Sequence, residues 1–447
     1  MISRPTAASG LMAEAESYWT PRRRNLVLAI LCVVGLFNFV DRQVITVLLQ
    51  PIKEEFHASD TQMGFLTGLA FAAFYALAGI PIARLADVRT RKMVIAVCLA
   101  FWSLMTTLGG AAVGFWMLAG TRIGVAVGEA GAAPTSQSIL MDLFPLNRRA
   151  VVLGLLSGTQ SLGIGLGVFL GGWLSQAFGW RAAFLIVGAP GLLLALIVYL
   201  WVREPPRGFS EPVRAEQAPP PPLGQVIRRL FSTPSYVLSL ATVGLGGLGG
   251  YGMLNWGPTF MVRIHHMSAA QVGTWIGAAI AGSLFLGIMS SSMIADWAAR
   301  KDMRAYPWIA AIGPLVAIPP GLWFVSEHDW RFAVAAYFLM TFAQCSHNTL
   351  SYVIGQTVSP VRMRAVSSVI MGLVTTLVGI GIGPFAIGVL NDLLEPRYGT
   401  EAVRYSLSFI TLGWLGAAVT ATLASFYIRS DYARLQQEIA DAAAAAS

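Results

Sequence analysis

The segment ARLADVRTRK at residues 83–92 decides the fold, because a related segment, SMIADWAARK, returns at residues 292–301. Each segment follows a long apolar run and carries an Asp four residues before an Arg-Lys pair. Such paired halves are typical of transporters whose binding site lies between two parallel repeats. Two more pairs of motifs repeat in the same order: PLNRRAV (145–151) with PVRMRAV (360–366), and GIGLG (163–167) with GIGIG (379–383).

The composition is that of a membrane protein. Apolar residues make up 55% of the chain and charged residues only 12%, with a mean hydropathy of +0.64, whereas soluble domains carry about 25% charged residues. At roughly 20 apolar residues per span, the chain can supply ten to twelve spans. We predict an all-α membrane fold of twelve spans in two six-helix pseudo-repeats, over residues 25–47, 62–84, 92–111, 114–140, 149–175, 180–202, 236–262, 271–295, 305–325, 330–358, 363–394 and 403–428.

The repeats define the expected domains. Residues 219–222 are four consecutive prolines, which cannot form a membrane helix and predict a semi-extended linker. A basic cluster followed by apolar residues opens the chain but lacks a small-residue cleavage site, so it is interpreted as an uncleaved first helix. The expected parts are an N-terminal segment (1–24), a first bundle (25–202), a Pro-rich linker (203–235), a second bundle (236–428) and a C-terminal tail (429–447).

The positive charges lie mainly on one side of this layout. Most of the 30 Lys and Arg residues fall in alternate loops, the linker and the tail, so the positive-inside rule predicts a multi-pass protein of the cell inner membrane with both termini cytoplasmic. The net charge of +8 is spread over these loops and does not indicate a nucleic-acid partner. All three cysteines lie in apolar runs, which argues against a disulfide framework or a metal site.

Four ionisable residues stand within predicted spans: Asp41, Arg42, Arg122 and Glu129. Each costs about 2.5–3.5 kcal/mol at a helix centre, so they must face one another or water. One interpretation is a structural ion-pair network between the first and fourth spans. The other is a proton switch, because desolvation raises a carboxyl pKa and a nearby Arg lowers it. Asp41 is then the first candidate for the proton carrier. Arg42 is its partner or an anion contact, and Glu129 shares the proton or pairs with Arg122.

The second half has no charged residue at a span centre. A cavity between the halves would be charged on one wall and mostly apolar on the other, which suits an amphiphile with an anionic head. His347 is equally well interpreted as a hydrogen-bonded packing residue. The candidates for the cavity wall are Tyr75, Tyr251, Asn255, Trp256, Gln344, His347 and Asn348.

A cytoplasmic gate is expected at Asp87, Arg91 and Lys92, after the second span. Its expected role is to keep the outward-facing state closed on the inside by pairing with the end of the eleventh helix and capping a helix.

Over nearly the whole chain these motifs resemble the major facilitator superfamily. Leu85, Asp87, Arg91 and Lys92 match its loop signature, with Ala83 and Thr90 in place of glycines. Helix 5 resembles the motif of antiporters, with Val168 in place of the proline. Within the superfamily the spinster family is the most similar, on these residues: Asn38, Asp41, Arg42, Arg122, Gly128, Glu129, Ala130, Pro134, Thr135, Asp142, Leu143 and Phe144.

The resemblance implies export of sphingosine phosphate or lysophospholipids. The proton-coupled organic-anion symporters share four of these residues and leave a second substrate class, small anions such as sugar acids, open. No phosphate-binding loop, metal spacing or G-x-S-x-G motif occurs, so a pump or an enzyme is not expected.

A channel or a receptor is the remaining non-transport alternative. We therefore expect a monomeric secondary transporter that works by alternating access. It would use no cofactor, with a proton as the coupling ion, and its partners would be membrane lipids and a lipid or small-molecule substrate.

Overall fold

The computed structural model describes residues 18–210 and 221–446, and within these ranges it is helical and contains no strand. The elements of the first half are α2 (Pro21–Gln43), α3 (Ile45–Phe56), α4 (Asp60–Gly64), η1 (Phe65–Leu69), α5 (Ala70–Val88), α6 (Arg91–Gly109), α7 (Phe115–Glu129), α8 (Ala132–Leu143) and α9 (Leu146–Trp201). Those of the linker and second half are α10 (Leu223–Phe231), α11 (Pro234–Arg263), α12 (Ala269–Ala299), α13 (Ala305–Ser326), α14 (Trp330–Gln344), α15 (Ser346–Thr357), η2 (Val361–Met363), α16 (Arg364–Val374), η3 (Thr375–Ile382), α17 (Gly383–Tyr398), η4 (Gly399–Glu401) and α18 (Ala402–Ala446).

These elements form the twelve predicted spans. Eight helical stretches of the described chain are long and apolar enough to cross a membrane. Two of them hold two spans each, Leu146–Trp201 and Val361–Asp441, and the chain reverses in them at Gly179 (φ 83°) and Gly399 (φ 55°), a backbone region that favours glycine. The remaining two spans, α7–α8 and α14–α15, are each interrupted partway.

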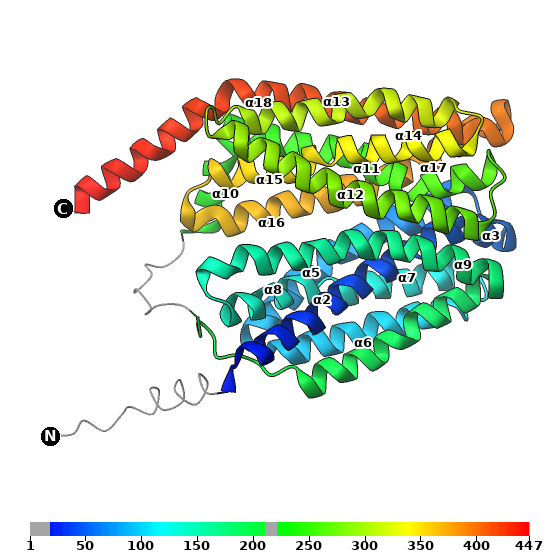
Figure 1. Ribbon diagram of the computed structural model, residues 1–447, viewed down its shortest axis with the longest axis horizontal. Coiled ribbons are helices and arrows are strands. Elements are labelled where there is room, and N and C mark those ends of the chain that lie inside the picture. Colours follow the sequence, from blue (N-terminus) through cyan, green and yellow to red (C-terminus); the bar gives the residue numbers. More distant parts are fainter. Residues whose placement is uncertain (1–17, 211–220, 447) are drawn as a thin grey trace.

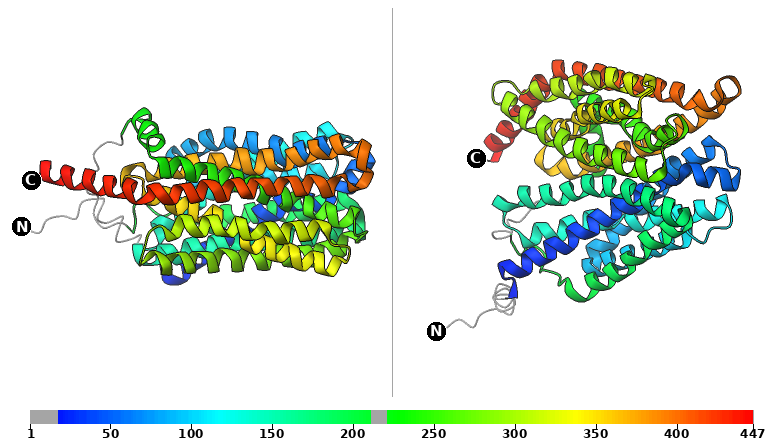
Figure 2. Two further views of the ribbon diagram at one scale, coloured as in Figure 1. Left: turned by 90° about the horizontal axis from the view of Figure 1, so that it is seen from above. Right: turned by 45° about the vertical axis from the view of Figure 1, so that its right-hand side comes forward.

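The two bundles lie side by side with their helices roughly parallel (Figures 1 and 2). The start of α2, the described part of the linker and the end of α18 lie at one end of the molecule, which we call the linker end. The opposite end, where α4 begins at Asp60, we call the Asp60 end. At the Asp60 end one hydrophobic cluster runs through both bundles and includes Leu48 and Met63 of the first and Met253 and Trp256 of the second. The halves therefore share a core there.

The space around the glycines of the second span shows that the two halves separate toward the linker end. A Cβ on Gly64 would lie 2.6 Å from the Pro384 carbonyl oxygen, and one on Gly68 would lie 2.5 Å from that of Gly381. On the same span, a Cβ on Gly79 would meet nothing within 4 Å. Close approach of two backbones at small residues is a common packing device in membranes, and here it is confined to the Asp60 end.

The structure has helices in parts of the linker and tail, for which the sequence predicted a semi-extended linker (203–235) and a C-terminal tail (429–447). Residues 1–17 and 211–220, including Pro219 and Pro220, lie outside the described residues. The remainder of the linker contains the helix α10, whose alternating apolar and basic residues were overlooked, and α18 continues as one helix through Ala446. Asp431 of α18 accepts hydrogen bonds from the Ser235 backbone N–H (2.9 Å) and hydroxyl (2.6 Å), which fixes this extension to α11.

Candidate functional site

The first and fourth spans bring the four predicted charged residues together. Asp41 and Arg42 lie near the end of α2, and Arg122 and Glu129 lie on α7. Helical hydrogen bonding in the fourth span breaks just after Glu129, because Pro134 has no N–H to donate to the Ala130 carbonyl. Interrupted helices beside polar groups are common where a membrane protein lines a site.

Arg42 forms an ion pair with Glu129. Arg42 Nη2 and Nε donate to Glu129 Oε2 at 2.7 and 3.0 Å, and the Glu129 side chain is fully buried. The Arg42 side chain is 15% exposed, and it is the most accessible member of the quartet because Asp41 and Glu129 are at 0% and Arg122 is at 2%. This pair connects α2 to α7.

The observed contacts differ from two predicted pairings, that of Asp41 with Arg42 and that of Glu129 with Arg122. Arg42 had been assigned to Asp41 as a possible partner, but side chains of consecutive helical residues point about 100° apart and do not face each other. Arg122 in turn donates from Nη1 to the Asp41 backbone carbonyl at 3.2 Å, and it does not pair with Glu129. Periodicity along the first span would have excluded the pairing of Asp41 with Arg42, but it does not indicate the partner of either residue.

The Asp41 carboxyl is buried and both of its oxygens lack a hydrogen-bond partner among the described residues. Trp102 and Thr106 of α6 face it, yet their donor atoms are also unpartnered. Buried polar groups without partners are rare in proteins, and each calls for a specific explanation. Among the described residues Asp41 is thus the one acid of the quartet that forms no ion pair in this conformation, although the Arg122 guanidinium is close enough to act on it electrostatically.

Aromatic rings surround Arg42. Its guanidinium carbon lies 5.0 Å from the ring centre of Phe39, 4.7 Å from that of Phe71 and 5.2 Å from that of Tyr75. Distances below about 6 Å give cation–π attraction. Tyr251 of the second half packs against the core of the first half and lies near Arg42. Tyr75 and Tyr251, which were predicted as candidates for the cavity wall, are therefore half-buried residues near Arg42.

The other candidates in the second half lie deeper in the protein. Trp256 is fully buried and donates from its indole N–H to the Pro384 carbonyl at 2.9 Å, so in this conformation it packs inside the second bundle. Asn255 is 6% exposed and donates to the Tyr251 carbonyl at 2.9 Å.

The tenth span contributes the last three candidates. His347 is 3% exposed, its ring fills the space beside Gly246, and its Nδ1 contacts the Gln344 carbonyl. This environment agrees with the packing interpretation of His347. Gln344 lies against Gly250 of α11, and Asn348 is half-buried on α15.

The predicted cytoplasmic gate makes its contacts within the first half. Arg91 is buried and binds Asp142 (2.5 Å) and Glu204 (2.8 Å), and Lys92 donates to the Tyr199 carbonyl at 3.3 Å. Asp87 is exposed at the end of α5. In this conformation Arg91 thus joins the spans of its own bundle to the start of the linker, and the expected contact with the end of the eleventh span is not formed among the described residues.

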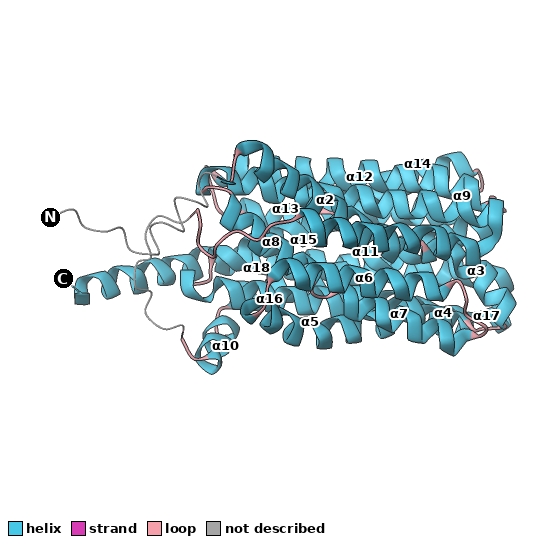
Figure 3. Cartoon of the chain, turned by 90° about the horizontal axis from the view of Figure 1, so that it is seen from below, coloured by secondary structure: helices cyan, strands magenta, loops and turns pink. Residues whose placement is uncertain are grey.

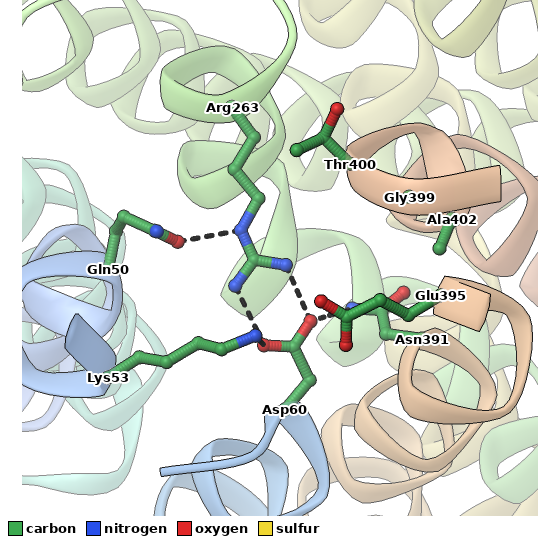
Figure 4. A pocket seen from close by; sticks show the side chains of 9 residues that line it. All are labelled: Gln50, Lys53, Asp60, Arg263, Asn391, Glu395, Gly399, Thr400 and Ala402. Carbon is green, nitrogen blue, oxygen red and sulfur yellow. Dashed lines mark hydrogen bonds and ion pairs between the residues drawn. The ribbon is translucent and has the colours of Figure 1, made fainter. Parts of the chain in front are cut away.

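A charged contact that was not predicted from the sequence joins the halves at the Asp60 end (Figure 4). Arg263 of α11 donates to both Asp60 carboxylate oxygens, at 2.5 and 2.7 Å. Lys53 and Asn391 donate to the same carboxylate at 2.7 and 2.9 Å. Asp60 is only 2% exposed, and these donors come from α3, α11 and α17. A cavity of about 240 Å³ adjoins the contact and is lined by residues that include Gln50 and Glu395.

A second contact at this end is a helix cap supplied by the other half. The Asp392 carboxylate of α17 accepts from the backbone N–H groups of Asp60 (2.9 Å) and Thr61 (2.8 Å) at the start of α4. These N–H groups have no partner within their own helix, and negative charge is favourable at a helix N-terminus. The polar residues at these span ends, in a chain with few charges, were the signal available in the sequence.

Comparison with known proteins covers nearly the whole chain. The model of the Major Facilitator Superfamily matches residues 31–386. An MFS-type efflux pump of Mycolicibacterium smegmatis is 33% identical over 412 residues, which cover 92% of this chain and 95% of that protein. Protein spinster homolog 1 of Homo sapiens is 27% identical over 454 residues, covering 94% and 84%.

A solved structure agrees with these relatives. The crystal structure of a bacterial homolog of the human lysosomal transporter Spinster, in an inward-facing and unoccupied conformation, matches with a TM-score of 0.85 and 28% identity. The match covers 92% of this chain and 99% of that one. The fold and the relatives therefore point to the same group of proteins.

Proposed function

This chain belongs to the Major Facilitator Superfamily and is a spinster-like secondary transporter, and from that premise we propose that it moves an amphiphilic anionic lipid by proton-coupled alternating access. The substrate class is a lysophospholipid or a sphingosine phosphate. The observation that carries the proposal is the position of Arg42, which is the most accessible charge of the quartet and stands between Glu129 and three aromatic rings.

The surroundings of Arg42 suit an anionic head attached to an apolar tail. Glu129 takes the Nε and Nη2 donors of Arg42, and Nη1 remains for an anion. Guanidinium groups bind phosphate and carboxylate well, since their planar donors match the spacing of two oxygens. The rings of Phe39, Phe71 and Tyr75 and the second half, which has no charged residue at a span centre, would accommodate the tail. A small sugar acid would use the same donor but not the apolar wall.

We assign the coupling proton to Asp41. A buried carboxylate that accepts no hydrogen bond is unfavourable, and Asp41 has this environment here. A protonated Asp41 removes that cost while the Arg42–Glu129 pair remains intact. When the bundles rock, a shift of α2 against α7 would bring the Asp41 carboxyl to Arg122 and release the proton. Glu129 is the second carrier, and it would take the proton when a substrate anion draws Arg42 away.

The conformation supports alternating access. The halves are joined at the Asp60 end and separate toward the linker end. With the linker end on the cytoplasmic side of the membrane, as the positive-inside rule indicates, this is an inward-facing state. The solved relative carries the same description.

Transport in proteoliposomes with an imposed pH gradient tests the proposal. The probes are a fluorescent lysophospholipid and a labelled sugar acid, each measured with the unmodified protein and with Arg42→Gln. We expect saturable lysophospholipid movement that responds to the gradient and is lost in Arg42→Gln. Transport of the sugar acid alone would favour the small-anion symporter. Flux that does not saturate and is accompanied by single-channel currents would contradict a carrier.

A further inference from the structure

We propose that the linker helix α10 is a membrane-surface anchor whose exposed apolar strip, Leu223, Ile227 and Phe231, inserts into the interfacial region of the bilayer. These residues are 61%, 41% and 51% exposed. Their spacing of four residues places them along one side of the helix. The occupant that we infer for this strip is therefore lipid.

Two further apolar residues of α10 lie beside this strip and are already covered by protein. Val226 and Leu230 are 2% and 1% exposed and pack in a cluster with Tyr236 of α11 and Ile428 of α18. At 100° per residue, these two positions lie directly beside the exposed strip around the helix. The bundle thus covers only part of one continuous apolar surface, and the rest remains free in the described structure.

The remaining side of α10 is polar. Gln225 and Arg228 are exposed on the face away from the bundle. Arg228 lies next to the strip, where a long basic side chain can keep its stem in the apolar layer and its head at the lipid phosphates. A short helix with protein on one side, an apolar strip below and polar residues above is the pattern of interfacial helices.

The position and direction of α10 in the molecule agree with a helix at the membrane surface. It projects from the side of the bundle at the linker end, crosswise to the long helices (Figures 2 and 3). The span α11 begins at Pro234, three residues after α10 ends, so α10 lies at the level where the chain enters the membrane. A helix crosswise to the spans at that level runs along the membrane surface.

The anchor is fixed to the second bundle by charge. Arg229 donates from Nη2 to both Glu438 oxygens of α18, at 2.9 and 3.0 Å, and from Nη1 to the Thr233 hydroxyl at 2.8 Å. These contacts leave the apolar strip untouched. An inserted α10 would therefore hold the start of the second bundle at the membrane surface while the first bundle moves.

Fluorescence quenching on the full chain tests this inference. A variant with Cys32, Cys98 and Cys345 replaced by alanine receives one cysteine, either Ile227→Cys or Gln225→Cys, and an environment-sensitive dye. Both proteins are reconstituted in vesicles of phosphatidylethanolamine and phosphatidylglycerol, with doxyl-labelled lipids as the membrane quencher and iodide as the aqueous quencher. The two sites lie two residues apart, so they share any global change in the protein.

We expect the dye at position 227 to emit at shorter wavelength and to lose fluorescence with doxyl lipids, and the dye at position 225 to lose it with iodide. Equal quenching by iodide at both positions would overturn the inference. Protection of position 227 from both quenchers would also overturn it, because protein rather than lipid would then cover the strip. A second variant, Ile227→Glu with Phe231→Glu and the dye at 223, should lose the lipid quenching if the helix leaves the surface, and unchanged quenching would contradict insertion.

Discussion

Arg42 binds Glu129, 87 residues away along the chain, and not its immediate neighbour Asp41. The pairing leaves one acid of the intramembrane quartet neutralised and the other without a partner. A network built only for stability would be expected to satisfy both acids. The asymmetry therefore agrees with a site that exchanges a proton between two states.

The Arg42–Glu129 pair should show strong coupling in stability. Removing one partner of a buried pair typically costs about 3–5 kcal/mol because the other charge remains uncompensated. We expect Arg42→Gln and Glu129→Gln each to lower the melting temperature in detergent, and the double variant to be less destabilised than the sum of the two. Scanning fluorimetry of the four proteins measures this, and additive effects would show that the pair is energetically independent.

The contact at the Asp60 end should set the balance between the two conformations. Asp60→Asn combined with Asp392→Asn removes the two negative charges that bind Arg263 and the N-terminus of α4, and should raise the population that is open at this end. Spin labels at the exposed positions Glu54 and Arg397, one on each half, report the separation as a distance distribution.

A matched control for this experiment is an ion pair within the first half. Arg181 binds Glu55 at 2.5 Å near the same end, so Glu55→Gln removes an ion pair without touching the other bundle. We expect the distance distribution to remain unchanged in that control. A shift of equal size in both proteins would mean that the Asp60 contact does not join the halves.

Gly68 should be needed for closure at the Asp60 end. A Cβ there would lie 2.5 Å from the Gly381 carbonyl oxygen of the other half, so Gly68→Val should force the halves apart and slow transport. Gly79→Val on the same span is the control, because a Cβ at Gly79 meets nothing within 4 Å. Equal transport rates in the two variants would contradict this account of packing.

Much of the fold could be predicted from hydropathy, since a hydrocarbon environment permits few alternatives to long apolar helices. Most span ends were predicted within four residues, but the first span continues to Phe56 and the last helix to Ala446. The repeated motifs indicated two bundles. The helix α10 was overlooked because its apolar residues form a short amphipathic pattern beside a run of prolines, and such a pattern has no hydropathy peak.

The site was predicted in part. Four charges in an apolar chain had to face each other, so the grouping of Asp41, Arg42, Arg122 and Glu129 could be expected. Their pairing depends on the rotation of α2 against α7, which spacing on one helix does not specify. The contact between Asp60 and Arg263 depends on which conformation the protein adopts. Because the sequence of an alternating-access transporter encodes at least two conformations, it does not specify this contact.

Proton uptake at Asp41 is the central claim, and transport by Asp41→Asn tests it most directly. The control is Asp302→Asn in the loop between α12 and α13, where the Arg304 backbone N–H holds the pKa of the Asp302 carboxyl below its usual value, so that it stays ionised at neutral pH. In proteoliposomes with and without a pH gradient, we predict that Asp302→Asn responds to the gradient as the unmodified protein does. Asp41→Asn should fold with an unchanged melting temperature and move substrate at a rate that the gradient no longer alters. A folded Asp41→Asn protein with undiminished gradient-driven transport would contradict the account.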